Sequence, residues 1–170
     1  MPKLTRRMGN ALTALACFGL LAFALYSQYV LELYPCPLCI FQRIAVAGLG
    51  LVTLIAALHN PARVGTIVYT VLALAAGGLG VGIAARHVWL QNLPPDQVPA
   101  CGAGLDYMLD TLPLTSVVRQ VLTASGECAE VSWRFLGLTM PTWVVIAVSV
   151  LLLWVLVVNT RLPRRTAPAL

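Results

Sequence analysis

The chain has 170 residues, of which 59% are hydrophobic and 10% are charged, and its mean hydropathy is +0.86. A soluble domain of this size is far more polar, so a lipid bilayer is the expected solvent. The formal net charge is +5, but no run of Lys and Arg is interleaved with aromatic residues, so nucleic acid is a poor candidate partner.

Four apolar segments are about long enough to cross the ~30 Å hydrocarbon core. They cover about residues 11–30, 40–58, 66–85 and 143–158. The first is too long for a removed signal peptide and lacks a small-residue cleavage site, so we interpret it as a retained span. The motif HNPARVG (59–65) predicts a tight turn between two spans. The predicted fold class is an all-α membrane protein, a bundle of four transmembrane helices.

Charged residues are distributed unevenly between the two ends of these spans. If the spans alternate in direction, seven basic residues fall on one side: Lys3, Arg6, Arg7, Arg63, Arg161, Arg164 and Arg165. All six acids fall on the other side, in the connections 31–39 and 86–141. Because Lys and Arg in short loops favour the cytoplasm, the segments 1–10, 59–65 and 159–170 are expected there, and both connections with acids outside.

The connection 86–141 is long, and connections of this kind are usually functional or disordered. Apolar residues recur within it at helical spacing: Leu114, Val117, Val118, Val121 and Leu122. This pattern predicts a short amphipathic helix. The helix either lies flat on the outer leaflet or packs on other loop segments, and the sequence leaves both alternatives open.

The five cysteines divide by position. Cys17 lies in the middle of the first span, where a free cysteine behaves as a small hydrophobe. Cys36 and Cys39 lie in the short outer connection, and Cys101 and Cys128 lie in the long one. An even number of cysteines on the oxidising side of a membrane indicates disulfides.

The motif YPCPLCIFQR (34–43) places a dithiol and a cation at the start of the second span. A Cys36–Cys39 bridge closes too small a ring to be a useful staple, so its value is expected to be chemical. Cys39 comes near the first helical turn, where the helix dipole favours a thiolate. Arg43 lies one turn later on the same face. It either snorkels to headgroups or, as we favour, stabilises negative charge on a lipid-soluble quinone that accepts the electrons.

The chain resembles the disulfide bond formation protein B family, bacterial inner-membrane thiol oxidases that reduce quinone. The resemblance rests on YPCPLCIFQR (34–43), RHVWLQ (86–91), Cys101 and ASGECAEVSWRFLGLTMPTW (124–143). It implies that both outer connections are periplasmic. It also implies that the chain re-oxidises a thioredoxin-like periplasmic partner, disulfide bond formation protein A, and passes the electrons to ubiquinone or menaquinone.

The resemblance also implies roles for single residues. Cys36 and Cys39 match the quinone-coupled pair, Cys39 being the residue that forms the thiolate–quinone state, and Arg43 matches the arginine beside the quinone. Cys101 and Cys128 match the disulfide that exchanges with the partner, through a mixed disulfide on Cys101.

Two further positions match the family less directly. His87 and Gln91 fall near family positions at the quinone pocket, but the run from His87 to Cys101 differs by about a residue. For His87, a role at the end of a helix, where its charge pairs with the dipole, is an equal alternative.

Three other functions fit parts of the sequence. A protein related to vitamin K epoxide reductase also has a four-helix core and a CxxC, but that motif usually comes late in its chain. A membrane protein with a Cys₄ zinc site would favour two closely spaced pairs, and Cys101 and Cys128 are far apart. A structural bundle would use Gly78-x-x-x-Gly82 as a helix-packing motif, but it leaves the dithiol unexplained.

Overall fold

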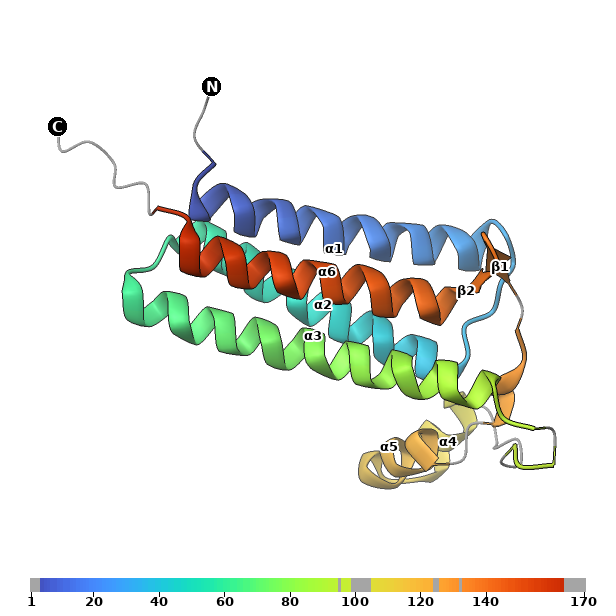
Figure 1. The fold of residues 1–170 in the computed structure, drawn as a ribbon. Helices are drawn as coiled ribbons and strands as arrows, with labels where there is room; N and C mark the ends of the chain where they lie inside the picture. Colours follow the sequence, from blue (N-terminus) through green and yellow to red (C-terminus); the bar gives the residue numbers. More distant parts are fainter. Residues whose placement is uncertain (1–3, 95, 99–104, 124–125, 132, 164–170) are drawn as a thin grey trace, which may run out of the picture.

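A computed structural model of the chain describes residues 4–94, 96–98, 105–123, 126–131 and 133–163. Four long helices lie side by side, and the short elements gather at one end of the bundle (Figure 1). In chain order the elements are α1 (Arg6–Tyr29), α2 (Pro37–His59), α3 (Arg63–Gln91), α4 (Leu105–Thr111), α5 (Leu114–Thr123), the 3-10 helix η1 (Gly126–Ala129), β1 (Arg134–Phe135), β2 (Leu138–Thr139) and α6 (Met140–Arg161).

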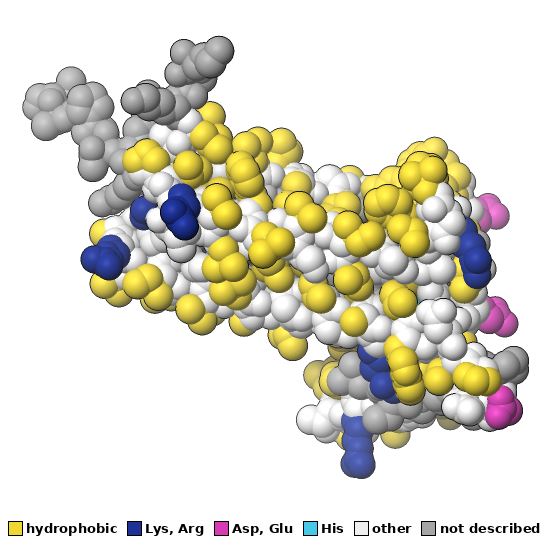
Figure 2. Space-filling view, in the orientation of Figure 1, with side chains coloured by type: hydrophobic (Ala, Val, Ile, Leu, Met, Phe, Trp, Pro, Cys, Tyr) yellow, Lys and Arg dark blue, Asp and Glu magenta, His cyan; other side chains and the backbone are white. Residues whose placement is uncertain are grey.

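The four long helices confirm the predicted four-helix membrane fold. In the described part of the chain, α1, α2, α3 and α6 are long and apolar enough to cross a membrane, with mean hydropathies of 1.8, 2.0, 2.0 and 2.6 over their most apolar windows. Large apolar side chains cover the outside of the bundle along its length (Figure 2). Water would oppose so much exposed apolar surface, whereas lipid would cover it.

Local sequence signals explain where several helices begin and end. The Thr5 hydroxyl accepts a hydrogen bond from the Met8 N–H at 3.4 Å and caps α1. Pro37 and Pro141 stand in the first turns of α2 and α6, where a missing N–H costs nothing. Asn60 ends α2 in the left-handed region, with φ 45°, and Pro61 follows it.

Helix α3 extends past the predicted end of the third span. The span was expected to end at about residue 85, where Arg86 and His87 interrupt the apolar run, but the helix continues to Gln91. It continues because the buried face persists, with Ala84 and His87 one turn apart and Leu90 following. His87 and Gln91 therefore belong to the last two turns of a long helix and not to a loop.

The middle of the bundle is a tightly packed apolar core. Its buried members are Cys17, Val46, Leu49, Ala73, Val148 and Val155, which come from all four long helices. Cys17 is 0% exposed, so it occupies the bundle as a small apolar side chain, as predicted.

Gly78 and Gly82, which a purely structural bundle would use for helix packing, do not pack against another helix of the described chain. Neither glycine has another side chain or backbone atom of the described chain within 4 Å of a Cβ placed on it. The contact face of α3 instead passes through Gly77, where such a Cβ would lie 2.5 Å from the Leu152 side chain of α6, and through Gly80, beside Ala45 of α2. The GxxxG pattern lies on α3, which does pack closely on its neighbours, but on a different face of that helix.

Polar side chains join three helices at the end where the chain begins and ends. The Asn10 amide donates to the Asn159 Oδ1 at 2.9 Å, and the Asn159 amide donates to the Thr70 hydroxyl at 3.0 Å. The Arg6 guanidinium donates to the Thr66 hydroxyl at 3.0 Å. These bonds connect α1, α3 and α6, and they satisfy polar groups that lipid could not.

The predicted amphipathic helix is present as α5, and its buried face packs on protein. Val117 and Val121 are each 1% exposed. They form a second apolar cluster with Leu38 of α2, Leu90 of α3, Met108 of α4 and Cys128 of η1. Leu114 and Val118 remain exposed. Of the two alternatives, the structure supports packing on other segments for the inner face.

Candidate active site

The motif PCPLC builds the N-terminus of α2. Cys36 is the N-cap residue, and its carbonyl accepts hydrogen bonds from the backbone N–H groups of Cys39 at 3.0 Å and Ile40 at 3.2 Å. Pro37 is pre-organised for the first turn. The two sulfur atoms lie 3.2 Å apart as free thiols. A disulfide needs about 2.05 Å, so bridging requires a shift of roughly 1 Å.

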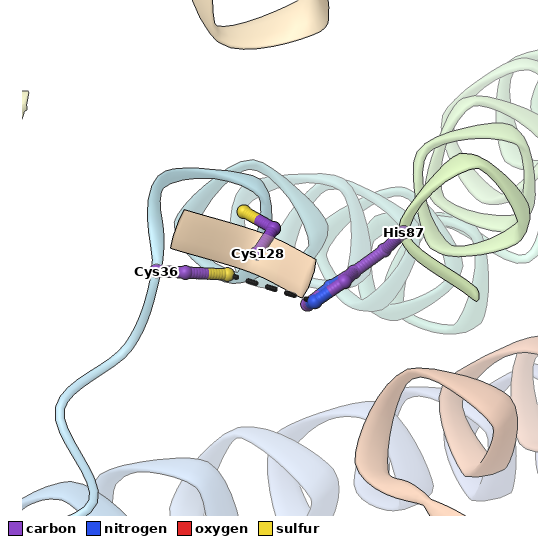
Figure 3. A group of neighbouring side chains, drawn as sticks. All are labelled: Cys36, His87 and Cys128. Atoms are coloured by element: carbon purple, nitrogen blue, oxygen red, sulfur yellow. Dashed lines mark hydrogen bonds between the residues drawn. The ribbon is translucent and has the colours of Figure 1, made fainter. Parts of the chain in front are cut away.

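A third thiol lies against this pair. Cys128 in η1 is 1% exposed, and its sulfur, the Cys36 sulfur and a ring nitrogen of His87 all lie within 4.8 Å of one another (Figure 3). A hydrogen bond with the Cys36 thiol raises the pKa of Cys128 far above that of an ordinary thiol, and burial raises it further. Cys128 is therefore held as a neutral thiol beside Cys36.

The predicted partner of Cys128 is not part of the described structure. Cys101 lies outside the described residues, so the Cys101–Cys128 disulfide stays a prediction. The structure does bring Cys128 to the Cys36–Cys39 pair, although 89 positions separate Cys39 from Cys128 in the sequence. The two outer connections thus meet at the start of α2.

His87 lies at the centre of the cluster and is 3% exposed. Its Nε2 is 3.8 Å from the Cys36 sulfur, and its Nδ1 is 3.9 Å from the Cys39 sulfur. The Gln42 amide nitrogen lies 3.2 Å from Nδ1, and the Gln91 amide nitrogen lies 3.4 Å from Nε2. The ring is near the end of α3, as the dipole interpretation required, but it points toward the cysteines of α2 (Figure 3).

Arg43 reaches sideways to α1. Its guanidinium donates one hydrogen bond to the Gln28 side-chain oxygen and another to the Ala24 carbonyl at 3.0 Å. The side chain is half-buried, and further N–H groups remain for a ligand. Helix α1 therefore holds the guanidinium beside the cavity.

A cavity of about 660 Å³ opens beside the dithiol. Apolar side chains of α1 and α6 form much of its wall, among them Leu20, Leu21, Phe23, Val144 and Ala147. Its polar side contains Cys36, Cys39, Gln42, Arg43, His87 and Gln91. Both the size and the mixture of an apolar wall with a few convergent polar groups are typical of a small-molecule site.

An aromatic group borders the same cavity. Trp133 stacks on Phe135 with ring centroids 5.8 Å apart, and Trp133 meets Phe23 edge-on at 6.5 Å. The Trp143 indole donates to the Phe135 carbonyl at 3.1 Å. The β1–β2 hairpin turns through Leu136 and Gly137, both with positive φ. Aromatic rings with one polar edge suit the boundary between lipid and water, where sequence analysis placed this end.

The structure thus joins Cys36, Cys39, Arg43, His87 and Gln91 around one cavity, and it places Cys128 beside Cys36 and His87. Sequence reasoning missed the contact of Gln42 with His87 and of Gln28 with Arg43. Both glutamines lie within apolar helices, where a buried polar side chain needs a partner. The presence of these two polar residues within apolar segments was the sequence signal for both contacts.

Comparison with known proteins places this site in a family. The sequence model described as "Disulfide bond formation protein DsbB" matches residues 6–158, which include the described site. The chain belongs to this family.

Curated relatives agree over nearly their whole length. A protein of Saccharophagus degradans is 52% identical over 149 residues, covering 85% of this chain and 90% of its own. One of Chromobacterium violaceum is 48% identical over 153 residues, covering 90% and 92%. One of Nitrosococcus oceani is 54% identical over 141 residues, covering 81% and 83%. Each is named "Disulfide bond formation protein B". These matches favour this family over the vitamin K epoxide reductase, zinc-protein and structural alternatives.

Proposed function

We propose that this chain is a thiol oxidase of a bacterial inner membrane. It re-oxidises a thioredoxin-like periplasmic protein, disulfide bond formation protein A, and passes two electrons to a membrane quinone. The observation that carries the proposal is the Cys36–Cys39 pair, placed at the polar side of an apolar cavity with Cys128 beside Cys36. Membership in the disulfide bond formation protein B family supports it independently.

The partner side of the reaction uses the second cysteine pair. A thiolate of the reduced partner attacks Cys101 in the Cys101–Cys128 disulfide, forming a mixed disulfide and releasing Cys128 as a thiol. The second thiol of the partner then displaces Cys101, so the partner leaves with one new S–S bond. Two electrons and two protons have moved to Cys101 and Cys128, and each bond formed has replaced one broken.

Transfer to the first pair follows from where Cys128 lies. Its sulfur is positioned to attack Cys36 of an oxidised Cys36–Cys39 pair, which releases Cys39 as the leaving thiol. Attack of Cys101 on Cys128 then restores the second disulfide and leaves Cys36 and Cys39 reduced. The raised pKa of Cys128 makes it a weak nucleophile until a base takes its proton. His87, near Cys36, is placed to be that base.

The cavity residues fit a quinone. A quinone supplies an acceptor for two electrons and two protons when it is bound. The apolar wall suits a quinone ring and keeps water from it, and Cys39 lines the cavity at its polar side. Arg43 offers charged donors to a carbonyl oxygen there. The Gln91 Oε1 is buried without a hydrogen-bond partner in the described part of the chain, so it is available to accept from a hydroxyl.

The orientation in the membrane is part of the proposal. The helix ends at Arg6 and Arg161 lie at the same end of the bundle, and the start of α2 and η1, which contain Cys36, Cys39 and Cys128, lie at the other end (Figure 1). On the face shown in Figure 2, the acidic side chains of the described residues appear at the cysteine end. This arrangement supports cytoplasmic segments at 1–10, 59–65 and 159–170, with periplasmic connections at 31–39 and 86–141.

The proposal is tested by separating its two half-reactions. In Cys101→Ser, quinone should still oxidise chemically reduced Cys36 and Cys39, whereas turnover with the reduced partner should stop. In Cys39→Ser, the partner should still form a mixed disulfide, whereas quinone reduction should stop. Cys17→Ala, in the core of the bundle, is the matched control and should retain both. Full turnover of the Cys101→Ser variant with the partner would overturn the relay.

A further inference from the structure

Three potential metal ligands converge when the chain is reduced, and the Cys39 thiol lies beside two of them. The sulfurs of Cys36 and Cys128 and a nitrogen of His87 lie within 4.8 Å of one another. The Cys39 sulfur lies 3.2 Å from that of Cys36 and 3.9 Å from the His87 Nδ1. The ligands come from the start of α2, the end of α3 and η1, three elements that pack together at one end of the bundle (Figure 3).

These separations are close to those that a zinc ion requires. Zinc binds four ligands at tetrahedral angles, with Zn–S about 2.3 Å and Zn–N about 2.0–2.1 Å, so its ligand atoms lie roughly 3.5–3.8 Å apart. The Cys36 sulfur and His87 Nε2 are already 3.8 Å apart. Cys36 and Cys39 need to separate by only about half an ångström. Cys39 contacts the other ring nitrogen, Nδ1, so its side chain must rotate toward Nε2 and the Cys128 sulfur to complete the site as a fourth ligand.

We propose that the reduced chain binds one Zn²⁺ through Cys36, Cys39, Cys128 and His87. Each thiol loses its proton to solvent as its sulfur binds the metal, and no electron is transferred. The ion binds only the reduced chain, because a Cys36–Cys39 disulfide removes two of the four ligands. Zinc bound there holds the thiols that the oxidase cycle needs, so the site is an inhibitory one.

The surroundings of the site support a bound metal. Zinc on Nε2 of His87 leaves a proton on Nδ1, and the Gln42 amide lies 3.2 Å from Nδ1. With its amide turned so that the oxygen faces the ring, Gln42 accepts that proton and fixes the imidazole. Three thiolates and Zn²⁺ carry one net negative charge, and Arg43 lines the same cavity. The cluster is thus compensated without an acidic ligand.

This site differs from the zinc site weighed in the sequence analysis. There, the long separation of Cys101 from Cys128 argued against two closely spaced pairs. The structure replaces Cys101 with His87 and brings Cys128 to the CxxC motif, giving a Cys₃His set. Zinc binding itself concerns the reduced thiols alone, whereas its inhibitory effect rests on the proposed function.

The test measures metal binding without quinone or partner protein. The full chain, in detergent micelles without oxygen, is reduced with a phosphine and titrated with Co²⁺, whose tetrahedral thiolate complexes absorb visibly. Zn²⁺ then displaces it, and competition with a chromophoric chelator gives the affinity. We expect one ion per chain for the reduced protein and none for the protein oxidised at Cys36 and Cys39. Equal binding by both redox forms would overturn the proposal without need of any variant.

Matched variants then define the ligand set. Cys128→Ser and His87→Ala should each weaken zinc binding by about tenfold or more, since even groups that only support a ligand contribute 10–100-fold. Cys101→Ser and Cys17→Ala should bind as the parent does. Unchanged affinity in Cys128→Ser, or lost affinity in Cys101→Ser, would contradict the site. Helical content and thermal unfolding of each variant show whether it is folded before the metal is added.

Discussion

At the scale of single residues, Arg43 links the cavity to helix α1. Its hydrogen bonds to Gln28 and to the Ala24 carbonyl fix the guanidinium against α1. A side chain anchored in this way presents its remaining donors in a fixed direction, which is how a charge acts on a bound ligand without reorganising. A snorkelling arginine would instead be mobile at the headgroups.

Replacing Arg43 separates these two roles. Arg43→Ala removes a charge-assisted interaction of about 1.5–3 kcal/mol, which predicts a loss of roughly ten- to a hundred-fold in the efficiency of quinone reduction. Arg43→Lys keeps the charge but loses the planar set of donors, so we expect a higher KM for quinone and a partial loss of rate. The measurement is quinone-dependent turnover per folded molecule. Parental turnover in both variants, with only a lower membrane yield, would indicate snorkelling.

The raised pKa of Cys128 should make its thiol slow to react with an alkylating reagent. The hydrogen bond with Cys36 and burial favour the neutral thiol in the folded state. The resulting contribution to the free energy of unfolding is present below the ordinary thiol pKa. It is lost as the pH rises through the pKa of Cys128 in the folded chain. In the fully reduced chain, alkylation of Cys128 should keep accelerating at pH values where an ordinary thiol has levelled off. Mass spectrometry of the alkylated peptides over a pH series measures this, with the Cys36→Ser variant as control. A Cys128 profile that levels off as an ordinary thiol does would contradict the assignment.

Sequence predicted some of these residues well and others not at all. The one-turn spacing of Cys39 and Arg43 follows from helix geometry, and both line the cavity. The contact of Cys128 with Cys36 did not follow, because it depends on how a long, irregular connection closes on the bundle. For His87, position near a helix end was predictable, but the direction of its ring was not.

At the scale of elements, Gly9 permits a close contact between α1 and α6. Gly9 is buried against Val158, and a Cβ at Gly9 would lie 2.6 Å from both methyl carbons of that side chain. Val158 is itself 0% exposed and β-branched, so it has little freedom to move away. Gly19, ten residues later in the same helix, has open space at its Cβ position.

The two glycines therefore make a matched pair. Gly9→Ala should force α1 away from α6 and lower the free energy of unfolding by about 1–3 kcal/mol, the usual cost of overpacking. Gly19→Ala should leave it unchanged or raise it by up to about 1 kcal/mol, since alanine is the better helix former. Reversible unfolding in mixed micelles measures both. Equal effects of the two substitutions would show that the close contact at Gly9 has no energetic importance.

Some features of these elements follow from patterns in the local sequence, and others do not. Hydropathy located all four long helices, and periodicity located α5, because both follow from the local sequence. The third span was predicted to end at about residue 85, and α3 continues beyond it to Gln91, because a drop in hydropathy is not the end of a helix. A GxxxG pattern shows that a close approach is possible but not which face of α3 is used, and the structure uses Gly77 and Gly80.

At the scale of the whole molecule, the two ends of the bundle are chemically different. One end has the Asn10–Asn159 network and basic helix ends, and the other has thiols, aromatic rings and the cavity. Such asymmetry matches a protein that exchanges electrons with a soluble protein on one side of a membrane and with a lipid-soluble acceptor within it. The order of the helices brings the start of α2 and η1 to the same end of the bundle (Figure 1).

The proposed orientation predicts which thiols are accessible from outside the cell membrane. A membrane-impermeant thiol reagent, applied to reduced, intact spheroplasts, should label Cys36 or Cys101. A cysteine introduced at Arg63, the first residue of α3, should be labelled only after the membrane is opened. The reverse pattern would mean that the distribution of basic residues had been misinterpreted.

The central claim is that electrons from a periplasmic dithiol reach quinone through this chain. The most direct measurement mixes the purified protein with a reduced thioredoxin-like dithiol oxidase and a short-chain quinone, without oxygen, and follows both products at once. The account predicts one quinone reduced for each disulfide formed in the donor, with both rates falling together in Cys39→Ser. Donor oxidation that proceeds without quinone reduction, or quinone reduction that persists in Cys39→Ser, would contradict it.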